Sequence, residues 1–162
     1  MSLLNKFIGV FAAMTLPATA IAATATGRMN VRIAILASCE VVSASDLDFG
    51  TVSTLAAAID RTSTLTVKCS NTTPFNVGLS AGSNGGSVAS RRMSAGGSEH
   101  VTYSLYRDAA RTQLWGDTVG TDTHAATGNG SNQSFTVFGR VNTQNISAPG
   151  NYSDVVTVTI TY

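Results

Sequence analysis

The residues best suited to chemistry are spread along the chain without forming a catalytic motif. A hydrolase triad requires a serine activated by a histidine and a carboxylate. The chain has two histidines, His100 and His124, and no Gly-x-Ser-x-Gly nucleophile turn. Asp46 and Asp48 are close enough in sequence to suggest paired carboxylates, but they read more simply as a turn before Phe49. We therefore expect no enzyme activity and no catalytic residue.

Motifs that bind metals, phosphates or nucleic acids are missing as well. His100 and His124 stand at no ligand spacing to a cysteine, so no metal site is expected. Gly82, Gly85 and Gly86 lack the lysine of a phosphate-binding loop. Ten Lys and Arg against nine Asp and Glu give a formal charge of +1, which argues against the basic surface that nucleic acids require. No cofactor, nucleic acid or small-molecule substrate is predicted.

Two pairs of residues suggest surface features. Arg91-Arg92 is expected to lie on a solvated strand edge. Trp115 with Tyr106 has the composition of a carbohydrate-binding platform. Because large aromatic side chains more often serve packing, core or intersubunit packing is the preferred interpretation of this second pair.

The first 22 residues have the pattern of a cleavable secretory signal peptide. Lys6 precedes an apolar run over residues 7–16, and Pro17 and the sequence Ala20-Ile21-Ala22 follow. A membrane span needs about 20 predominantly apolar residues, and Pro17 interrupts this run too early for that. We expect cleavage after Ala22 and export of the mature chain.

Export determines the expected state of the two cysteines, Cys39 and Cys69. In an oxidising compartment a lone pair of cysteines is most simply one disulfide. The chain has no Cys-x-x-Cys pair that would suggest a redox role. A bridge that closes a loop of about 30 residues contributes about 3–4 kcal/mol in the chain-entropy model.

Apolar and polar residues alternate along most of the mature chain, and no helical period competes with this alternation. Only 12% of the residues are charged, and Thr, Ser, Gly, Ala and Val dominate, which favours strands and turns. The clearest alternating segments are residues 64–69, 75–80, 101–106, 135–141 and 156–162. They predict one all-β domain, an antiparallel immunoglobulin-like β-sandwich. A short helical turn is expected at residues 52–59.

The predicted sandwich is incomplete. About six strands are expected over residues 39–162, one fewer than the usual seven. The last strand continues to the final residue, and nothing follows that would cover its edge. A sandwich that lacks a strand has an apolar groove with unpaired backbone groups. The residues assigned to the groove and edge strand are Val156, Val158, Ile160 and Tyr162.

The segment before Cys39 is a strongly amphipathic strand. Its apolar face carries Met29, Val31, Ile33 and Ile35, and its polar face carries Arg28, Asn30 and Arg32. This strand would either fold back as the first strand of its own domain or be donated to the groove of another copy. The second arrangement would give an open head-to-tail filament. A period of two fits both arrangements equally well.

A set of short motifs in fixed order extends over nearly all of residues 24–162. They are Thr26-Gly27 before the amphipathic strand, Cys39, Leu47-Asp48-Phe49-Gly50, Leu65-Thr66-Val67-Lys68-Cys69-Ser70, Tyr103-Ser104-Leu105-Tyr106-Arg107-Asp108, Leu114-Trp115-Gly116, Val137-Phe138-Gly139-Arg140-Val141 and Gly150-Asn151-Tyr152-Ser153-Asp154. In these motifs the chain resembles the spore coat protein U family, which includes subunits of archaic, Csu-type chaperone–usher pili. The segment from Tyr106 to Thr112 is similar to the main rod subunits of those pili.

The resemblance implies a donor-strand segment at residues 23–38, with Met29, Val31, Ile33 and Ile35 as donor residues. It implies that identical or homologous subunits, a periplasmic chaperone and an outer-membrane usher are the partners. The chain would then pass through the periplasm to a surface fibre that serves attachment and biofilm formation. The alternatives are a spore or cell-surface coat protein and a self-complete secreted carbohydrate-binding module.

Overall fold

The computed structural model describes residues 21–145 and 148–162 and divides the chain into two units, Met1–Ala34 and Ile35–Tyr162. In the described part of the first unit, residues 21–34, neither strand nor helix forms and every residue is exposed. The predicted signal peptide falls mainly on residues 1–20, outside the described residues. The second unit contains all of the regular structure found in the described ranges.

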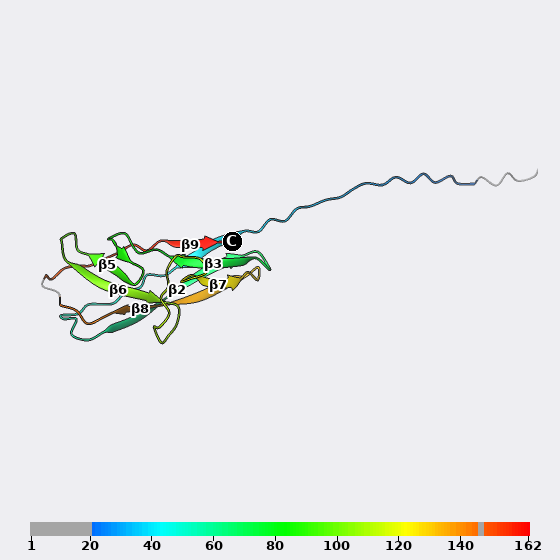
Figure 1. The fold of residues 1–162 in the computed structure, drawn as a ribbon. Helices are drawn as coiled ribbons and strands as arrows, with labels where there is room; N and C mark the ends of the chain where they lie inside the picture. Colours follow the sequence, from blue (N-terminus) through cyan, green and yellow to red (C-terminus); the bar gives the residue numbers. More distant parts are fainter. Residues whose placement is uncertain (1–20, 146–147) are drawn as a thin grey trace, which may run out of the picture. The chain divides into compact units, whose positions relative to one another are not determined.

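The described residues of the second unit form nine strands and no helix (Figure 1). The strands are β1 (Cys39–Ala44), β2 (Ile59–Cys69), β3 (Pro74–Leu79), β4 (Gly86–Ser87), β5 (Ser90–Ser94), β6 (His100–Tyr106), β7 (His124–Thr127), β8 (Asn132–Val141) and β9 (Val158–Thr161). The count exceeds the expected six because short strands such as β4, with two residues, carry no readable alternation.

The strands form two antiparallel sheets of unequal width. The larger sheet has the order β1-β2-β8-β6-β5-β4, and the smaller one has the order β7-β3-β9. The longest ladder joins β2 to β8 and pairs Ile59 with Val141 at one end and Lys68 with Asn132 at the other. The predicted fold class, an incomplete immunoglobulin-like β-sandwich, is confirmed. A sheet of three strands opposite a sheet of six leaves part of the larger sheet without a facing strand.

One hydrophobic core lies between the sheets and takes the inward residues of both. Leu65 and Val67 of β2 and Phe75 and Val77 of β3 are each at most 1% exposed. Trp115 is fully buried, and its Nε1 donates a hydrogen bond of 2.8 Å to the carbonyl of Val77. The preferred interpretation of Trp115 as a packing residue is therefore confirmed, and its ring is not a surface platform.

The expectation of a solvated edge is wrong for Arg91, although Arg92 is exposed. Alternation along β5 turns Arg91 inward, where its side chain is fully buried. Its guanidinium nitrogens donate to four backbone carbonyls at 2.7–2.9 Å, those of Leu79, Ser80, Val88 and Trp115. Burial is tolerated because these acceptors replace the water that the cation loses.

The expected helical turn at residues 52–59 is also wrong. Residues 52–58 are irregular, and Ile59 begins β2. Leu55 is buried in the core, and its carbonyl accepts a hydrogen bond of 3.1 Å from the backbone of Gln144. Packing and long-range hydrogen bonding therefore fix this segment in place of a local helical turn.

Candidate functional site

One edge strand of each sheet borders the open side of the sandwich. β1 is the outermost strand of the larger sheet, and β9 is an outermost strand of the smaller one. The two strands lie close together, but in the described part of the chain they do not pair with each other. Edge strands present unpaired backbone N–H and C=O groups, so this side of the molecule is suited to accept a further strand.

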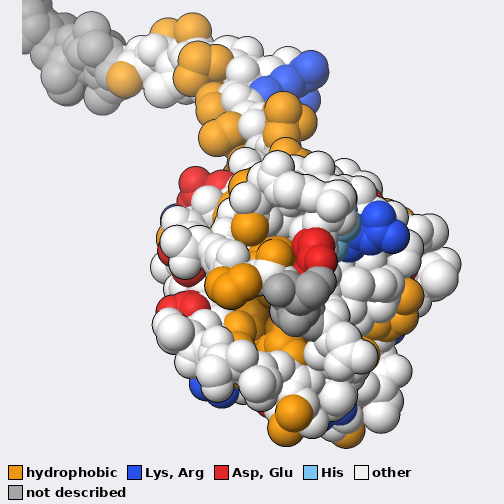
Figure 2. All heavy atoms as spheres, turned by 90° about the vertical axis from the view of Figure 1, so that its left-hand side faces the viewer, with side chains coloured by type: hydrophobic (Ala, Val, Ile, Leu, Met, Phe, Trp, Pro, Cys, Tyr) orange, Lys and Arg blue, Asp and Glu red, His pale blue; other side chains and the backbone are white. Residues whose placement is uncertain are grey.

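A cleft of about 1500 Å³ opens on this side of the second unit. One wall is the segment 44–56, which follows β1, and the other is the segment 148–158, which leads into β9. The floor consists of inward side chains of the core, among them Leu65, Leu79, Val101, Leu105 and Val137. Figure 2 shows apolar side chains gathered in a hollow of this face, with acidic side chains beside it. The cleft therefore exposes a path to the hydrophobic core.

The first wall is positioned by a glycine on the larger sheet. Gly139 lies on β8, and a Cβ atom at that position would come within 2.8 Å of the Leu47 side chain and 3.0 Å of the Phe49 ring. The Phe49 ring also packs edge-on against Tyr103, with ring centroids 6.1 Å apart. Because Gly139 has no side chain, Leu47 and Phe49 lie directly on the sheet and form the wall.

The second wall is an extended segment with regular alternation. Tyr152, Asp154, Val156 and Val158 are half-buried, whereas Val155 between them is 70% exposed. The backbones of Ser94 and Ser153 exchange two hydrogen bonds of 2.9 and 3.0 Å, and Ser80 donates to the carbonyl of Thr157 at 3.0 Å. The segment is thus tied to β5 at one end and to the end of β3 at the other.

Asp154 fixes the middle of the second wall. Its Oδ2 accepts a hydrogen bond of 2.7 Å from the Tyr103 hydroxyl, and its Oδ1 accepts from the backbone and hydroxyl of Ser83 at 2.8 and 3.0 Å. Burial raises the pKa of Asp154, but the hydrogen bonds from Tyr103, Ser83 and Val155 together lower it by more, and the net pKa lies below its usual value. Burial and the bond to Asp154 raise the pKa of the Tyr103 hydroxyl.

The residues that the sequence assigned to the groove fall in different places. Val156 and Val158 line the cleft. Ile160 packs against the core beyond the cleft lining, and Tyr162 is 60% exposed. The segment carrying the predicted donor residues is exposed, with fractions of 83–86% at Met29, Val31, Ile33 and Ile35. Their role as donors stays a prediction.

The predicted disulfide between Cys39 and Cys69 is present. The two cysteines form the first register pair of the β1–β2 ladder. Next to them, Ser70 donates its backbone N–H to the carbonyl of Ser38 at 2.8 Å, and Ser38 donates to the Ser70 hydroxyl at 3.1 Å. The start of β1 is therefore held by a covalent bond and by the hydrogen bonds between Ser38 and Ser70.

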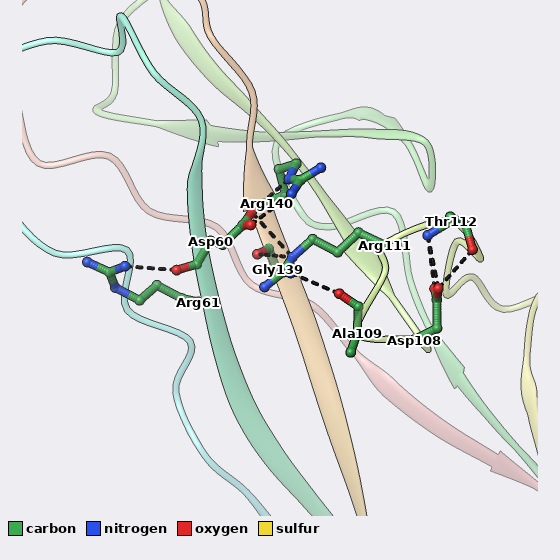
Figure 3. Close-up of polar contacts among 8 residues, drawn as sticks. All are labelled: Asp60, Arg61, Asp108, Ala109, Arg111, Thr112, Gly139 and Arg140. Carbon is green, nitrogen blue, oxygen red and sulfur yellow. Dashed lines mark hydrogen bonds and ion pairs between the residues drawn. The ribbon is translucent and has the colours of Figure 1, made fainter.

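A polar cluster on the outer face of the larger sheet is a second group that sequence reasoning missed (Figure 3). Arg140 on β8 donates Nε and Nη2 to the two carboxylate oxygens of Asp60 on β2, each at 2.7 Å. Arg111 lies 3.3 Å from the same carboxylate and over the Phe138 ring. The Arg140 hydrogen bonds hold the pKa of Asp60 below its usual value. Both carboxylate oxygens of Asp60 are engaged, so this cluster anchors the 107–113 loop and offers no free reactive group.

Residues 21–145 and 148–162 hold neither of two other kinds of site. Within these ranges no group of three or more His, Cys, Asp and Glu side chains could hold a metal ion. Within the same ranges no helix is long and apolar enough to span a membrane. The cleft is therefore the feature on which a functional interpretation rests.

The family model of the Spore Coat Protein U domain matches residues 25–159. The chain belongs to the spore coat protein U domain family. The match includes most of the amphipathic N-terminal segment together with both walls of the cleft.

Two known proteins are similar to this chain over most of its length. It is 32% identical to Protein U of Myxococcus xanthus over 157 residues, covering 87% of each chain. It is also similar, with a TM-score of 0.56 and 25% identity, to a chain in the CsuC–CsuE chaperone–tip adhesion subunit pre-assembly complex from the archaic chaperone–usher Csu pili of Acinetobacter baumannii. The likeness covers 79% of the present chain but 40% of the solved chain.

Proposed function

We propose that this spore coat protein U family member is a structural subunit of a surface pilus. Subunits would polymerise by donor-strand exchange, each inserting residues 23–38 into the cleft of the next copy. The observation that carries the proposal is the cleft between the segments 44–56 and 148–158, with apolar core side chains at its floor, in a chain that also has an exposed amphipathic segment. A heterologous contact of this kind produces an open filament.

The expected joint is strong. Four apolar side chains, those of Met29, Val31, Ile33 and Ile35, would contribute about 1.5–3 kcal/mol each on burial. A ladder of about eight backbone hydrogen bonds would add about 0.5–1.5 kcal/mol apiece. These gains must offset the ordering of a free segment and the immobilisation of a partner. The remainder favours a joint that dissociates slowly.

Assembly would require a chaperone, since an open apolar cleft with free strand edges aggregates. The similar solved chain comes from a complex between a chaperone and a pilus subunit, which supports a periplasmic chaperone as partner. We infer an outer-membrane usher from the same pathway. Exchange of a loosely packed chaperone strand for a better-packed donor strand would need no nucleotide.

The donor segment favours a rod or adaptor subunit over a tip subunit, because a subunit at the tip has no neighbour to which it would donate. Attachment and biofilm formation follow as the role of the fibre. A spore or cell-surface coat protein is the second candidate, supported by the family and by the relative that matches 87% of both chains. Chaperone and usher genes next to this gene would favour the pilus.

Replacement of Ile33 by Asp tests the donor role. Burying an unpaired carboxylate has a severe energetic cost, so Ile33→Asp should abolish the SDS-resistant ladders and fibres that the wild-type chain forms. Asn30→Asp places the same charge on the opposite face of the segment and serves as the control, which should still form SDS-resistant ladders and fibres at the end point, whatever its rate. Normal ladders from Ile33→Asp, or a wild-type chain that stays monomeric with its chaperone removed, would refute the proposal.

A further inference from the structure

We propose that charge selects the occupant of the cleft: its acidic rim attracts the basic donor segment of a second copy of this chain. This inference rests on the proposed function and adds a determinant of partner choice to the apolar fit. Three observations carry it: the charges that line the cleft, the charges of the donor segment, and the faces on which both sets lie.

All ionisable residues that line the described part of the cleft and carry a charge at neutral pH are acidic. They are Asp46 and Asp48 on the first wall and Asp154 on the second, and none of the lining residues is Lys, Arg or His. Asp46 and Asp48 are exposed, whereas Asp154 is half-buried and hydrogen-bonded to Tyr103. The two aspartates of the first wall are therefore the groups best able to meet a charge on an incoming chain.

The local structure holds this charge at the cleft mouth. Asp48 Oδ1 accepts a hydrogen bond of 2.7 Å from the backbone of Gly50, which keeps the carboxylate on the turn. The Arg61 guanidinium also lies near this turn, with Nη2 3.8 Å from where a Cβ of Gly50 would be, and its Nη1 donates to the backbone carbonyl of Asp60 at 2.8 Å. This cation lies outside the cleft lining and leaves the balance of the first wall negative.

The donor segment carries the opposite sign. Residues 23–38 contain two cations, Arg28 and Arg32, and no acidic residue. In a strand both arginines lie on the face opposite the apolar row, about 13 Å apart along the chain. With the apolar row turned toward the core floor, the arginines face the cleft mouth, where the carboxylates of the rim lie.

Such exposed charges act mainly on encounter and choice of partner. Complementary potentials raise association rates and disfavour partners of like charge, with a modest effect on dissociation. The effect extends over about 10 Å at 0.1 M salt and weakens as salt is added. A donor segment with the same apolar residues but acidic charges would therefore associate with the cleft more slowly than this basic one.

The experiment measures the polymerisation rate of the purified full-length mature chain at about 20 mM and about 500 mM NaCl. The donor variant carries Arg28→Glu and Arg32→Glu, the rim variant carries Asp46→Arg and Asp48→Arg, and a third chain combines all four changes. Asp117→Arg, which reverses an exposed charge outside the cleft lining, is the matched control. Thermal unfolding verifies that each variant folds.

At low salt the donor and rim variants should each polymerise at least about tenfold more slowly than the wild type. The combined variant should recover most of the rate, and Asp117→Arg should not differ from the wild type. At high salt the rates should converge. Equal rates for wild type and variants at low salt would overturn this inference while leaving strand exchange intact, whereas a wild-type chain that never polymerises would overturn both.

A peptide competition gives the same answer without altering the rim. Synthetic peptides of residues 23–38, one of natural sequence and one with Glu at positions 28 and 32, are added to the polymerising wild-type chain. The natural peptide should inhibit growth at a concentration about tenfold lower than the acidic peptide at low salt, and the difference should vanish at high salt. Equal inhibition at low salt would contradict the inference.

Discussion

The Tyr103 hydroxyl donates a hydrogen bond of 2.7 Å to Oδ2 of Asp154 and so joins β6 to the extended segment before β9. The two residues are 51 positions apart in the sequence. Because Asp154 also accepts hydrogen bonds from Ser83, this single carboxylate connects the 80–85 loop between β3 and β4 with the floor and one wall of the cleft.

Asp154→Asn should lower the free energy of unfolding by about 1–3 kcal/mol, since an amide oxygen accepts more weakly and leaves buried donors poorly satisfied. The pKa of Asp154 is lower in the folded chain than in the unfolded chain, where it is about 3.9. The ionised carboxylate therefore stabilises the fold fully above about pH 3.9, and this stabilisation is lost as the pH falls through the pKa of the folded chain. Urea unfolding at neutral and acidic pH measures both effects. The difference between wild type and variant should narrow in acid, and a constant difference would contradict the assignment.

His124 should make the fold less stable in mild acid. Burial lowers the pKa of His124, and the positive charge of Arg107 lowers it further. The centroid of its ring lies 4.8 Å from that of the Phe135 ring and 5.5 Å from that of the Trp115 ring. The folded chain therefore favours the neutral imidazole. The free energy of unfolding is at its full value above the pKa of His124 in the unfolded chain, about 6.5, and it declines as the pH falls below that value. The melting temperature should drop between about pH 6.5 and pH 5. His124→Phe should flatten that drop, and an unchanged slope would refute the assignment.

Arg91→Lys should destabilise the fold although it preserves the charge. The planar guanidinium reaches four carbonyls at once, and an ammonium on a flexible stem cannot satisfy the same set. We expect a loss of at least about 2 kcal/mol in the free energy of unfolding, from unsatisfied buried carbonyls. The neighbouring Arg92→Lys is the matched control on an exposed side chain and should change stability by less than about 0.5 kcal/mol.

Replacement of both cysteines by serine should lower stability by about 3–4 kcal/mol, the chain-entropy value for the loop between Cys39 and Cys69. Chemical unfolding of the oxidised chain and of the double Cys→Ser variant measures the difference. Mass spectrometry with and without reductant provides the control, because the wild-type chain must show no free thiol before reduction.

The sequence predicted the strands whose alternation is long and regular, such as β2, β6 and β8. It missed β1 because the register shifts between Val41 and Ser43, and the extra residue at this bulge breaks the period of two. It missed β5 because an arginine occupies an inward position, where the pattern calls for an apolar side chain. In both cases the tertiary environment determined the structure, and the local pattern did not reveal it.

In the candidate site too, alternation along the sequence is informative, whereas contacts between residues far apart in the sequence are not visible in the pattern. Val156 and Val158 belong to a continuous alternating run, and this alternation is sufficient to assign them to the groove. Asp154 continues the same inward row, but its role depends on Tyr103 and Ser83, which lie far away in sequence. The first wall is irregular, so its position depends on the absence of a side chain at Gly139, a relation that no periodicity encodes.

The bridge between Cys39 and Cys69 has a mechanical consequence for a fibre of the proposed kind. Tension arriving through residues 23–38 would enter the domain at Ser38 and would peel the outermost strand, β1, from its neighbour one residue pair at a time. The covalent bond occupies the first of those pairs, so the load passes directly to β2, which is flanked on both sides. In a stretched filament the disulfide would then keep β1 attached to β2, and the pull would not open the larger sheet at its edge.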